Sequence, residues 1–353
     1  METLRLRVEV GDLESEVSRA AIARCAEILR AGGTVAFPTE TVYGLGANAM
    51  DAGAVAKIFT AKERPEWDPL IVHIDDRAML TTVVAEVSPD AERLMEAFWP
   101  GPLTLLLPKH PRLPEAVTAG LARVGVRMPA HPVTRALLRA AKMAVAAPSA
   151  NRFGRTSPTS ADHVAEDLDG RIEAILDGGV TTHGVESTVV DVSAAGCGIY
   201  RPGVITEKQI RAICRGDVWE QTGEGESAGA APAPGMGVRH YAPRARLVLV
   251  EGPGGSQVTE LAKVVGRCEA EGENVGVMLP DAFLASLEGR RVQVYEWGSW
   301  SDAEELARRL FAGLRWLDAA GVTVIVAPMP EARGIGVAVR DRLRRAGKRQ
   351  DQG

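Results

Sequence analysis

Basic side chains recur beside short apolar runs that have the character of buried strands. Lys62 and Arg64 stand in the sequence Lys-Glu-Arg-Pro, Arg123 and Arg127 flank one apolar run, and Arg201 ends another. Because arginine binds pairs of phosphate or carboxylate oxygens bidentately, cations gathered from several strand ends can converge on a polyphosphate. Taken alone, Lys62 and Arg64 have a plainer explanation, since cations at the end of a helix also favour its dipole.

Hydroxyl and amide side chains cluster in two segments between these cations. The first is Gly32–Gly46, which joins a strand to a loop containing Thr41 and closes with spaced glycines. The second is Ala147–Asn151, in which Ser149 and Asn151 follow an apolar run and open a loop that holds Ser157. Such residues offer neutral hydrogen bonds to a ligand, and they also cap turns.

Several familiar signatures are missing. His73 lies inside an apolar run without a second histidine or a carboxylate cluster, so a structural role is favoured and no protein metal site is predicted. The sequence lacks a G-x-x-x-x-G-K-[ST] phosphate loop. Gly334 and Gly336 approach a dinucleotide fingerprint but lack its third glycine; between a strand and a helix they could bind an anion, although tight packing explains them better.

The elements that position these residues alternate irregularly in the first two thirds of the chain. Hydrophobic spacing predicts helices over 18–31, 52–61 and 132–141, and strands over 34–37, 70–74, 103–107, 125–128, 143–147, 174–176, 187–191 and 198–201. Hairpin-like neighbours among them indicate a mixed α/β sheet instead of a strict parallel repeat.

A second domain is predicted after a linker. The segment Gln221–Gly237 is rich in Gly, Ala, Pro and Ser. Beyond it, strands over 245–250, 274–278, 291–295 and 323–327 alternate regularly with helices over 258–271, 303–320 and 336–346. This alternation predicts a small doubly wound domain. We therefore divide the chain into domains 1–215 and 245–353, joined by residues 216–244.

Bulk properties exclude some classes of protein. The 353 residues carry a formal net charge of -5, which disfavours a protein that coats nucleic acid but leaves room for a local basic pocket. The four cysteines are scattered and suggest neither a zinc site nor a disulfide framework, which fits a reducing cytosol. We find neither a secretory signal nor an apolar run long enough for a membrane span, and we expect a cytoplasmic protein.

Seven ordered motifs together resemble the Sua5/YrdC family of threonylcarbamoyl-AMP synthases. They are PTETVYGLG (38–46), AKERPEWDPLIVHI (61–74), PGPLTLLL (100–107), VGVRMPAHP (124–132), APSAN (147–151), ESTVVD (186–191) and YRPG (200–203). The segment APGMGVRHYAP (233–243) and the second domain are similar to the longer, two-domain form. The resemblance implies a YrdC-like twisted mixed sheet with helices around a basic cavity, followed by a smaller Rossmann-like Sua5 domain.

The resemblance also implies an activity, that of a nucleotidyltransferase. L-threonine, bicarbonate and ATP would give L-threonylcarbamoyladenylate, diphosphate and water, with Mg²⁺ accompanying the nucleotide. A separate threonylcarbamoyl transferase complex would then modify adenosine 37 of tRNAs that read codons beginning with A. Two anions must be positioned and their charge neutralised, so no covalent nucleophile is expected.

Site roles carry over residue by residue from the family pattern. ATP is expected at Lys62, Arg64, Asp68, Arg123, Ser149, Asn151, Ser157 and Arg201, with Tyr241 of the linker motif reaching over the nucleotide. Threonine is expected at Thr41, His73, Arg127, the backbone of Ala147, and Ser187. One departure concerns Asp68, where the family commonly has Asn. An aspartate would repel phosphates unless it binds Mg²⁺ or turns to another donor.

Three other functions compete with this one. A basic concavity could bind RNA weakly, although the sequence is acidic and lacks an aromatic platform. Carbamoyl transfer occurs on related domains, but those carry cysteine motifs that are absent here. The second domain could bind a regulatory ligand of its own, although no residue in it makes a specific case.

The basic segment 340–349 is interpreted as a solvated helix end, with contact to tRNA or a partner as the lesser alternative.

Overall fold

The computed structural model describes residues 2–220 and 240–348, so the predicted linker 221–237 lies outside the described residues. The chain divides into two compact units. The first comprises Met1–Phe153, Ser157–Thr182 and Glu186–Gly237, and the second comprises Gly154–Thr156, His183–Val185 and Val238–Gly353. Because each unit has its own core, we describe them separately.

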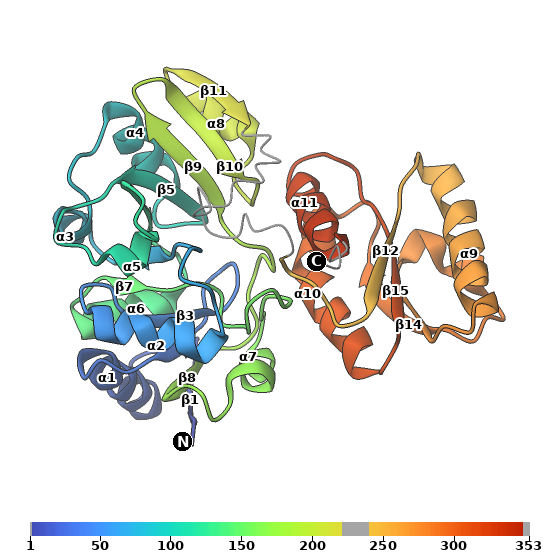
Figure 1. The fold of residues 1–353 in the computed structure, drawn as a ribbon, viewed down its shortest axis with the longest axis horizontal. Helices are drawn as coiled ribbons and strands as arrows, with labels where there is room; N and C mark the ends of the chain where they lie inside the picture. The colour runs from blue at the N-terminus through green and yellow to red at the C-terminus, as the bar shows by residue number, and fades with distance from the viewer. Residues whose placement is uncertain (1, 221–239, 349–353) are drawn as a thin grey trace. The chain divides into compact units, whose positions relative to one another are not determined.

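The first unit is built on a large mixed sheet with helices around it (Figure 1). Its strand order is β1-β8-β2-β3-β7-β4-β6-β5-β9-β10-β11. The strands are β1 (Leu4–Arg7), β2 (Val35–Phe37), β3 (Gly44–Asn48), β4 (Ile71–His73), β5 (Leu103–Pro108), β6 (Arg123–Arg127), β7 (Val145–Ala146), β8 (Ala174–Asp177), β9 (Thr188–Ser193), β10 (Gly196–Arg201) and β11 (Asp217–Glu220). Parallel and antiparallel pairs are mixed, which confirms the predicted fold class.

Within the described residues of this unit, eight α-helices connect the strands, and most begin with a side-chain cap. They are α1 (Glu16–Arg30), α2 (Ala52–Lys62), α3 (Leu80–Val83), α4 (Pro89–Phe98), α5 (Glu115–Thr118), α6 (Pro132–Ala141), α7 (Ala161–Leu168) and α8 (Glu207–Ile213), with a 3₁₀ turn η1 (Arg77–Met79). The three predicted helices are confirmed within two residues at each end. The sequence analysis missed α4, α7 and α8, although their caps Ser88, Ser160 and Thr206 are standard start signals.

Strand alternation divides the central strands into an apolar face and a polar face. Val72, Val126 and Leu105 belong to the main apolar core. The residues between them face the other way, because successive side chains of a strand point to opposite sides of its sheet. The pairing register of β4, β6, β5 and β9 places five polar side chains on that second face. They are His73 of β4, Arg123 and Arg127 of β6, Thr104 of β5 and Asp191 of β9. We call this second face the polar face.

Strand β3 was not predicted, because the sequence analysis treated its glycines as the close of a loop. Gly46 lies where a Cβ atom would come within 2.6 Å of Phe37 and Val145 side chains, so the strand accepts no larger residue there. Its other face, with Leu45 and Ala47, is fully buried. Glycine in a strand here marks a close approach of neighbouring side chains and not a turn.

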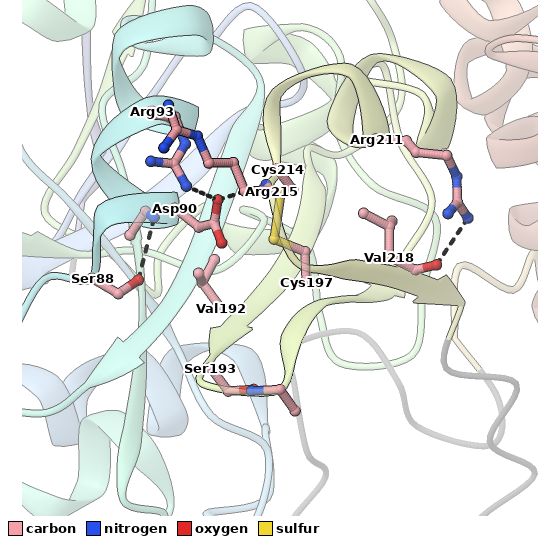
Figure 2. The surroundings of a disulfide bond; sticks show 12 residues. Ser88, Asp90, Arg93, Val192, Ser193, Cys197, Arg211, Cys214, Arg215 and Val218 are labelled. Carbon is pink, nitrogen blue, oxygen red and sulfur yellow. Dashed lines mark hydrogen bonds and ion pairs between the residues drawn. A yellow bond between two sulfur atoms is a disulfide. The ribbon is translucent and has the colours of Figure 1, made fainter.

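The prediction of unpaired cysteines is wrong for two of the four. Cys197 in β10 and Cys214, which ends α8, form a disulfide (Figure 2). The corner is fixed further by Asp90 of α4, which accepts a 2.9 Å hydrogen bond from the Arg215 backbone, and by Arg211, which donates to the Val218 carbonyl. Folding of β10, the following turn and α8 brings together two cysteines 17 residues apart, which their sequence spacing does not reveal.

The second unit contains a four-stranded, fully parallel sheet, which confirms the predicted doubly wound architecture. Its strands are β12 (Arg246–Val250), β13 (Val275–Pro280), β14 (Gln293–Gly298) and β15 (Val324–Pro328), in the order β12-β15-β13-β14. Its helices are α9 (Gly254–Ala270), α10 (Ala303–Ala319) and α11 (Gly336–Gly347), with a 3₁₀ segment η2 (Asp281–Leu287). Among the described residues, no helix is both long and apolar enough to cross a membrane.

Candidate functional site

Arg127 is the centre of a buried polar cluster on the polar face. Its guanidinium donates to the Thr41 hydroxyl at 2.9 Å and to the Gly101 carbonyl at 3.2 Å, and it lies 2.5 Å from a Glu40 carboxylate oxygen. Burial alone would raise the pKa of Glu40, but the charge and hydrogen bond of Arg127 outweigh it and hold that pKa below its usual range. Glu40 is therefore ionised at neutral pH.

His73 lies beside Arg127 because β4 and β6 pair in parallel with these two residues opposite each other. Burial and the neighbouring guanidinium lower the pKa of His73 to about 3, so its imidazole is neutral at physiological pH. Its Nδ1 atom makes no hydrogen bond with the residues that the structure describes. A neutral ring fits a polar, uncharged part of a ligand and not a phosphate.

Arg64 and Asp68 form a buried ion pair at 2.9 Å. Arg64 also donates to the carbonyls of Asp68, at 3.1 Å, and Pro69, at 2.8 Å. The sequence brings them together locally: α2 ends at Lys62, its C-cap Glu63 adopts the left-handed conformation, and the chain then turns toward β4. Asp68 thus faces a cation, which resolves the predicted charge conflict at this position.

The Lys62 ammonium donates to two backbone carbonyls, those of Ser149, at 2.5 Å, and Asn151. It therefore ties the end of α2 to the loop after β7. The Asn151 amide in turn donates to the Arg152 carbonyl at 2.8 Å. Lys62 is 87 residues from Ser149 and 89 from Asn151 along the chain, yet these contacts join the two segments into one local structure.

Arg201, at the end of β10, organises the start of β9. Its guanidinium donates to the Ser187 carbonyl at 3.0 Å and to the Ser187 hydroxyl at 3.1 Å. That hydroxyl also lies 2.8 Å from the hydroxyl of Thr104 on β5. The three side chains are buried together, which places a predicted ATP residue and a predicted threonine residue in direct contact.

Arg123 shares the polar face with Arg127 but lies four residues along β6, about 13 Å away at the usual strand rise. Its Nε atom is 2.5 Å from Asp191, and its Nη2 atom donates to the Leu106 carbonyl at 2.7 Å. The structure therefore does not bring Arg123 into the Arg127 cluster. Desolvation raises the pKa of Asp191 despite the arginine.

Two further predicted residues use their polar groups within the fold. Ser157 donates its hydroxyl to the Glu186 carboxylate, and both are buried. The Ala147 amide donates to the Ile71 carbonyl at 2.8 Å. A ligand-binding role for the backbone at Ala147 would therefore fall to its carbonyl oxygen.

Tyr241 belongs to the second unit and is almost fully buried there. Its ring stacks on Phe311 with the centroids 5.7 Å apart, and the Arg342 guanidinium lies 5.2 Å from its centroid. Tyr241 also adopts a positive φ of 65°, which is unusual for a residue other than glycine. These contacts fix the linker motif at the start of the second unit, and nucleotide contact by Tyr241 remains a prediction.

Glu40 and Thr104 were missed by the sequence analysis. Glu40 was quoted within PTETVYGLG but given no role, although a carboxylate beside two threonines could have been paired with one of the predicted arginines. Thr104 interrupts an otherwise apolar strand, Leu103–Pro108, and such a hydroxyl on a buried strand is a detectable signal. No group of three or more His, Cys, Asp or Glu residues that could hold a metal occurs within the described parts of the chain.

Comparisons with known proteins place this chain in a family. A model described as "Telomere recombination" (Sua5_yciO_yrdC) matches residues 27–203, and one described as "Threonylcarbamoyl-AMP synthase, C-terminal domain" matches residues 205–347. A threonylcarbamoyl-AMP synthase of Pyrococcus abyssi is 43% identical over 95% of this chain and 96% of that protein. One of Bacillus subtilis is 42% identical over 98% of each.

The fold agrees with a solved structure over both units. The crystal structure of P. abyssi Sua5 complexed with L-threonine has a TM-score of 0.89 and 42% identity, covering 98% of both chains. Fold and site thus define a two-domain α/β protein with a buried, arginine-rich polar face. The chain belongs to the Sua5/YrdC family of threonylcarbamoyl-AMP synthases.

Proposed function

We propose that this chain is a nucleotidyltransferase that makes L-threonylcarbamoyladenylate from L-threonine, bicarbonate and ATP, with Mg²⁺ entering as part of the nucleotide substrate. The observation that carries the proposal is the Arg127 cluster, a buried cation held between Glu40 and Thr41. A relative that matches the whole chain was crystallised with L-threonine, which supports an amino-acid site in this family.

The threonine site is proposed around Arg127, His73 and Thr41, with Ser187. A guanidinium suits the amino-acid carboxylate, and the neutral imidazole and the hydroxyls suit the polar groups of the substrate. Glu40 holds Arg127 in place by its ion pair. Because this cluster is buried, the carboxylate would bind in a region of low dielectric, where the interaction is stronger than in water.

The ATP site is proposed around Lys62, Arg64 and Arg201, with Ser149, Asn151 and Ser157. In the reaction, the threonine nitrogen and bicarbonate form an N-carboxylate with loss of water. A carboxylate oxygen then attacks the α-phosphorus of ATP, and the bond to the bridging oxygen breaks to release diphosphate. The protein contributes position and charge neutralisation, which accounts for a site with arginines and a lysine and without a required nucleophile.

Asp68 and Arg123 are proposed to act on the nucleotide indirectly. Asp68 orients Arg64 through their buried ion pair, and Arg123 is held by Asp191 at the far end of β6. Mg²⁺ is proposed to enter with the nucleotide phosphates, as it usually does at phosphoryl-transfer sites. The product would be consumed by the tRNA threonylcarbamoyl transferase complex in the cytoplasm.

The test is to incubate the purified chain with ATP, L-threonine and bicarbonate and to follow diphosphate release, with the adenylate identified by mass spectrometry. Diphosphate release that requires both threonine and bicarbonate, and needs no tRNA, is the expected result. Omission of each substrate provides the control. Release that depends on RNA, or that proceeds equally without threonine, would contradict the proposal and favour one of the competing functions.

A further inference from the structure

The parallel sheet of the second unit has a topological switch point. The strand order is β12-β15-β13-β14, and the switch point lies between β15 and β13. From β13 the chain continues through η2 to its neighbour β14. From β15 it continues in the other direction, into α11, which packs along β12. The connections that leave the neighbouring strands β15 and β13 therefore run in opposite directions. In open α/β sheets, ligands bind outside the carboxyl ends of the strands at such a point.

A cavity of about 880 Å³ lies at this position. It is lined by the segments that follow the carboxyl ends of three strands, together with the start of α10. These residues are Asp281 and Ala282 after β13, Ser299 to Ser301 after β14, Pro330, Glu331, Arg333 and Gly334 after β15, and Ala303 and Leu306 of α10. The volume falls within the range of small-molecule sites in proteins. All of these residues belong to the second unit, and none has a role in the proposed synthase reaction.

One end of the cavity is suited to an anion. Arg333 is exposed, and within residues 2–220 and 240–348 its guanidinium makes no hydrogen bond or ion pair. The 12-residue helix α11 begins at Gly336 and has no side-chain cap. The amides of its first turn donate to the backbone carbonyls of residues 333–335. The N-terminus of a helix carries a partial positive charge, which favours an anion beside it.

Gly334 and Gly336 are glycines for different physical reasons. A Cβ atom on Gly336 would lie 2.3 Å from the Glu331 carbonyl oxygen, so Gly336 is explained by packing. A Cβ atom on Gly334 would meet nothing within 4 Å, and the backbone there has φ +55°. Packing therefore does not account for Gly334, which lines the cavity and leaves open space at the start of α11.

The other side of the cavity offers a ring surface and hydrogen-bond acceptors. The Trp300 ring is half-buried and rests against Phe283 with the centroids 4.9 Å apart. Asp281 follows β13 directly, and its Oδ1 atom is fixed by the backbone amides of Trp300, at 2.9 Å, and Ala282, at 2.6 Å. An aromatic ring beside an exposed carboxylate suits a flat heterocycle and the hydroxyl groups of a sugar.

A second basic groove in this unit is a weaker candidate. It is lined by Arg244, Arg246, Arg267 and Lys348 along β12. Arg246 is already paired with Glu273, and Arg267 and Lys348 lie at the ends of α9 and α11. Cations at helix C-termini are explained by the helix dipole, and that end of a helix repels anions.

We propose that the cavity beside Arg333, Trp300 and Asp281 binds a mononucleotide. Its phosphate lies against Arg333 and the N-terminus of α11, its base lies against Trp300, and its sugar hydroxyls face Asp281. This site goes beyond the proposed synthase reaction, because its residues are separate from the polar face of the first unit. It gives the second unit a ligand-binding role of its own.

The experiment measures binding of AMP to the full-length chain carrying Arg64→Ala, which weakens the proposed nucleotide site of the first unit. Equilibrium dialysis is expected to find one equivalent of AMP per chain. Adding Arg333→Gln is expected to weaken binding at least tenfold, whereas Arg291→Gln, an exposed arginine before β14 and outside the cavity, should leave it unchanged. Hydrogen exchange should slow on AMP binding in peptides that cover 281–301 and 330–337.

Two further measurements keep the result interpretable. Adenosine and inorganic phosphate, tested separately, distinguish the base from the anion: Trp300→Leu should weaken adenosine binding and Arg333→Gln phosphate binding. Circular dichroism checks that each variant is folded. Arg333→Gln should still make the adenylate at the rate of the unsubstituted chain, which separates this proposal from the synthase function. Absence of AMP binding in the Arg64→Ala chain, or binding that ignores Arg333→Gln, would overturn it.

Discussion

The Arg64 guanidinium and the Asp68 carboxylate lie 2.9 Å apart, and both side chains are almost inaccessible to solvent. A buried pair of this kind contributes little net stability, because desolvation offsets the attraction, yet loss of one partner leaves an uncompensated charge. In this chain the pair also fixes the direction of a residue proposed to meet phosphate. Asp68 therefore limits both where Arg64 points and how much positive charge it offers.

Substitution of Asp68 should separate these two effects. Asp68→Asn keeps the shape and removes the negative charge, so we expect a severalfold lower KM for ATP with an unchanged KM for threonine. Asp68→Ala removes the partner altogether and should lower the free energy of unfolding by about 3–5 kcal/mol. Steady-state kinetics and urea unfolding measure the two outcomes. A higher KM for ATP in Asp68→Asn would show that the carboxylate assists nucleotide binding directly.

Arg64→Ala and Arg127→Ala should impair different substrates. Loss of Arg64 removes a cation proposed for the phosphates and should raise the KM for ATP at least tenfold. Loss of Arg127 removes the proposed partner of the amino-acid carboxylate and should raise the KM for threonine by a similar factor. Adenylate synthesis is measured with each substrate varied in turn. Unchanged synthesis in both folded variants would refute the assignment of the two sites.

Glu40→Gln tests whether Glu40 positions Arg127. The amide keeps a hydrogen-bond acceptor but removes the ion pair seen at 2.5 Å. We expect the KM for threonine to rise while the KM for ATP stays the same, because only the orientation of Arg127 changes. An exposed acid in the same unit, such as Glu14, provides a matched Glu→Gln control. A fall in kcat alone would contradict a positioning role in threonine binding.

The stability of the chain should fall as the pH decreases from neutral. The pKa of His73 is about 3 in the folded chain and near 6.5 in a model peptide, so the unfolded state binds the extra proton between these values. Glu40, whose pKa is also lowered in the folded chain, acts in the same direction below its ordinary value of 4.5. His73→Asn should flatten the pH dependence between pH 4 and 6.5. Urea unfolding at several pH values checks this, and an unchanged slope would contradict the buried, neutral state of His73.

Reduction of the disulfide should destabilise the first unit. A bond that closes a loop of this size contributes about 3 kcal/mol by restricting the unfolded chain. Adding dithiothreitol should therefore lower the free energy of unfolding of the oxidised protein by about that amount. The double variant Cys197→Ser, Cys214→Ser should show no response to dithiothreitol. Thiol titration in denaturant without reductant that finds four free cysteines would show that the bond is not formed, because Cys25 and Cys268 are buried in the folded chain.

Much of the architecture was predictable, because hydrophobic periodicity is a local property. Helices 132–141 and 303–319, and all four strands of the second unit, were placed within about three residues. The missed strand β3 shows where this fails: its glycines follow from the packing of Phe37 and Val145, which no window of sequence contains. The missed helices α4 and α8 are short, and their boundary signals were present but not used.

The sequence by itself determined the ordered motifs, the family to which they point, and which cations and hydroxyls were candidates. Only the tertiary structure decided the partner of each: Asp68 for Arg64, Glu40 for Arg127, Ser187 for Arg201, and Cys214 for Cys197. The physical reason is that side-chain type follows from the local sequence. Charge pairing, burial and pKa depend on neighbours that strand register brings from distant parts of the chain.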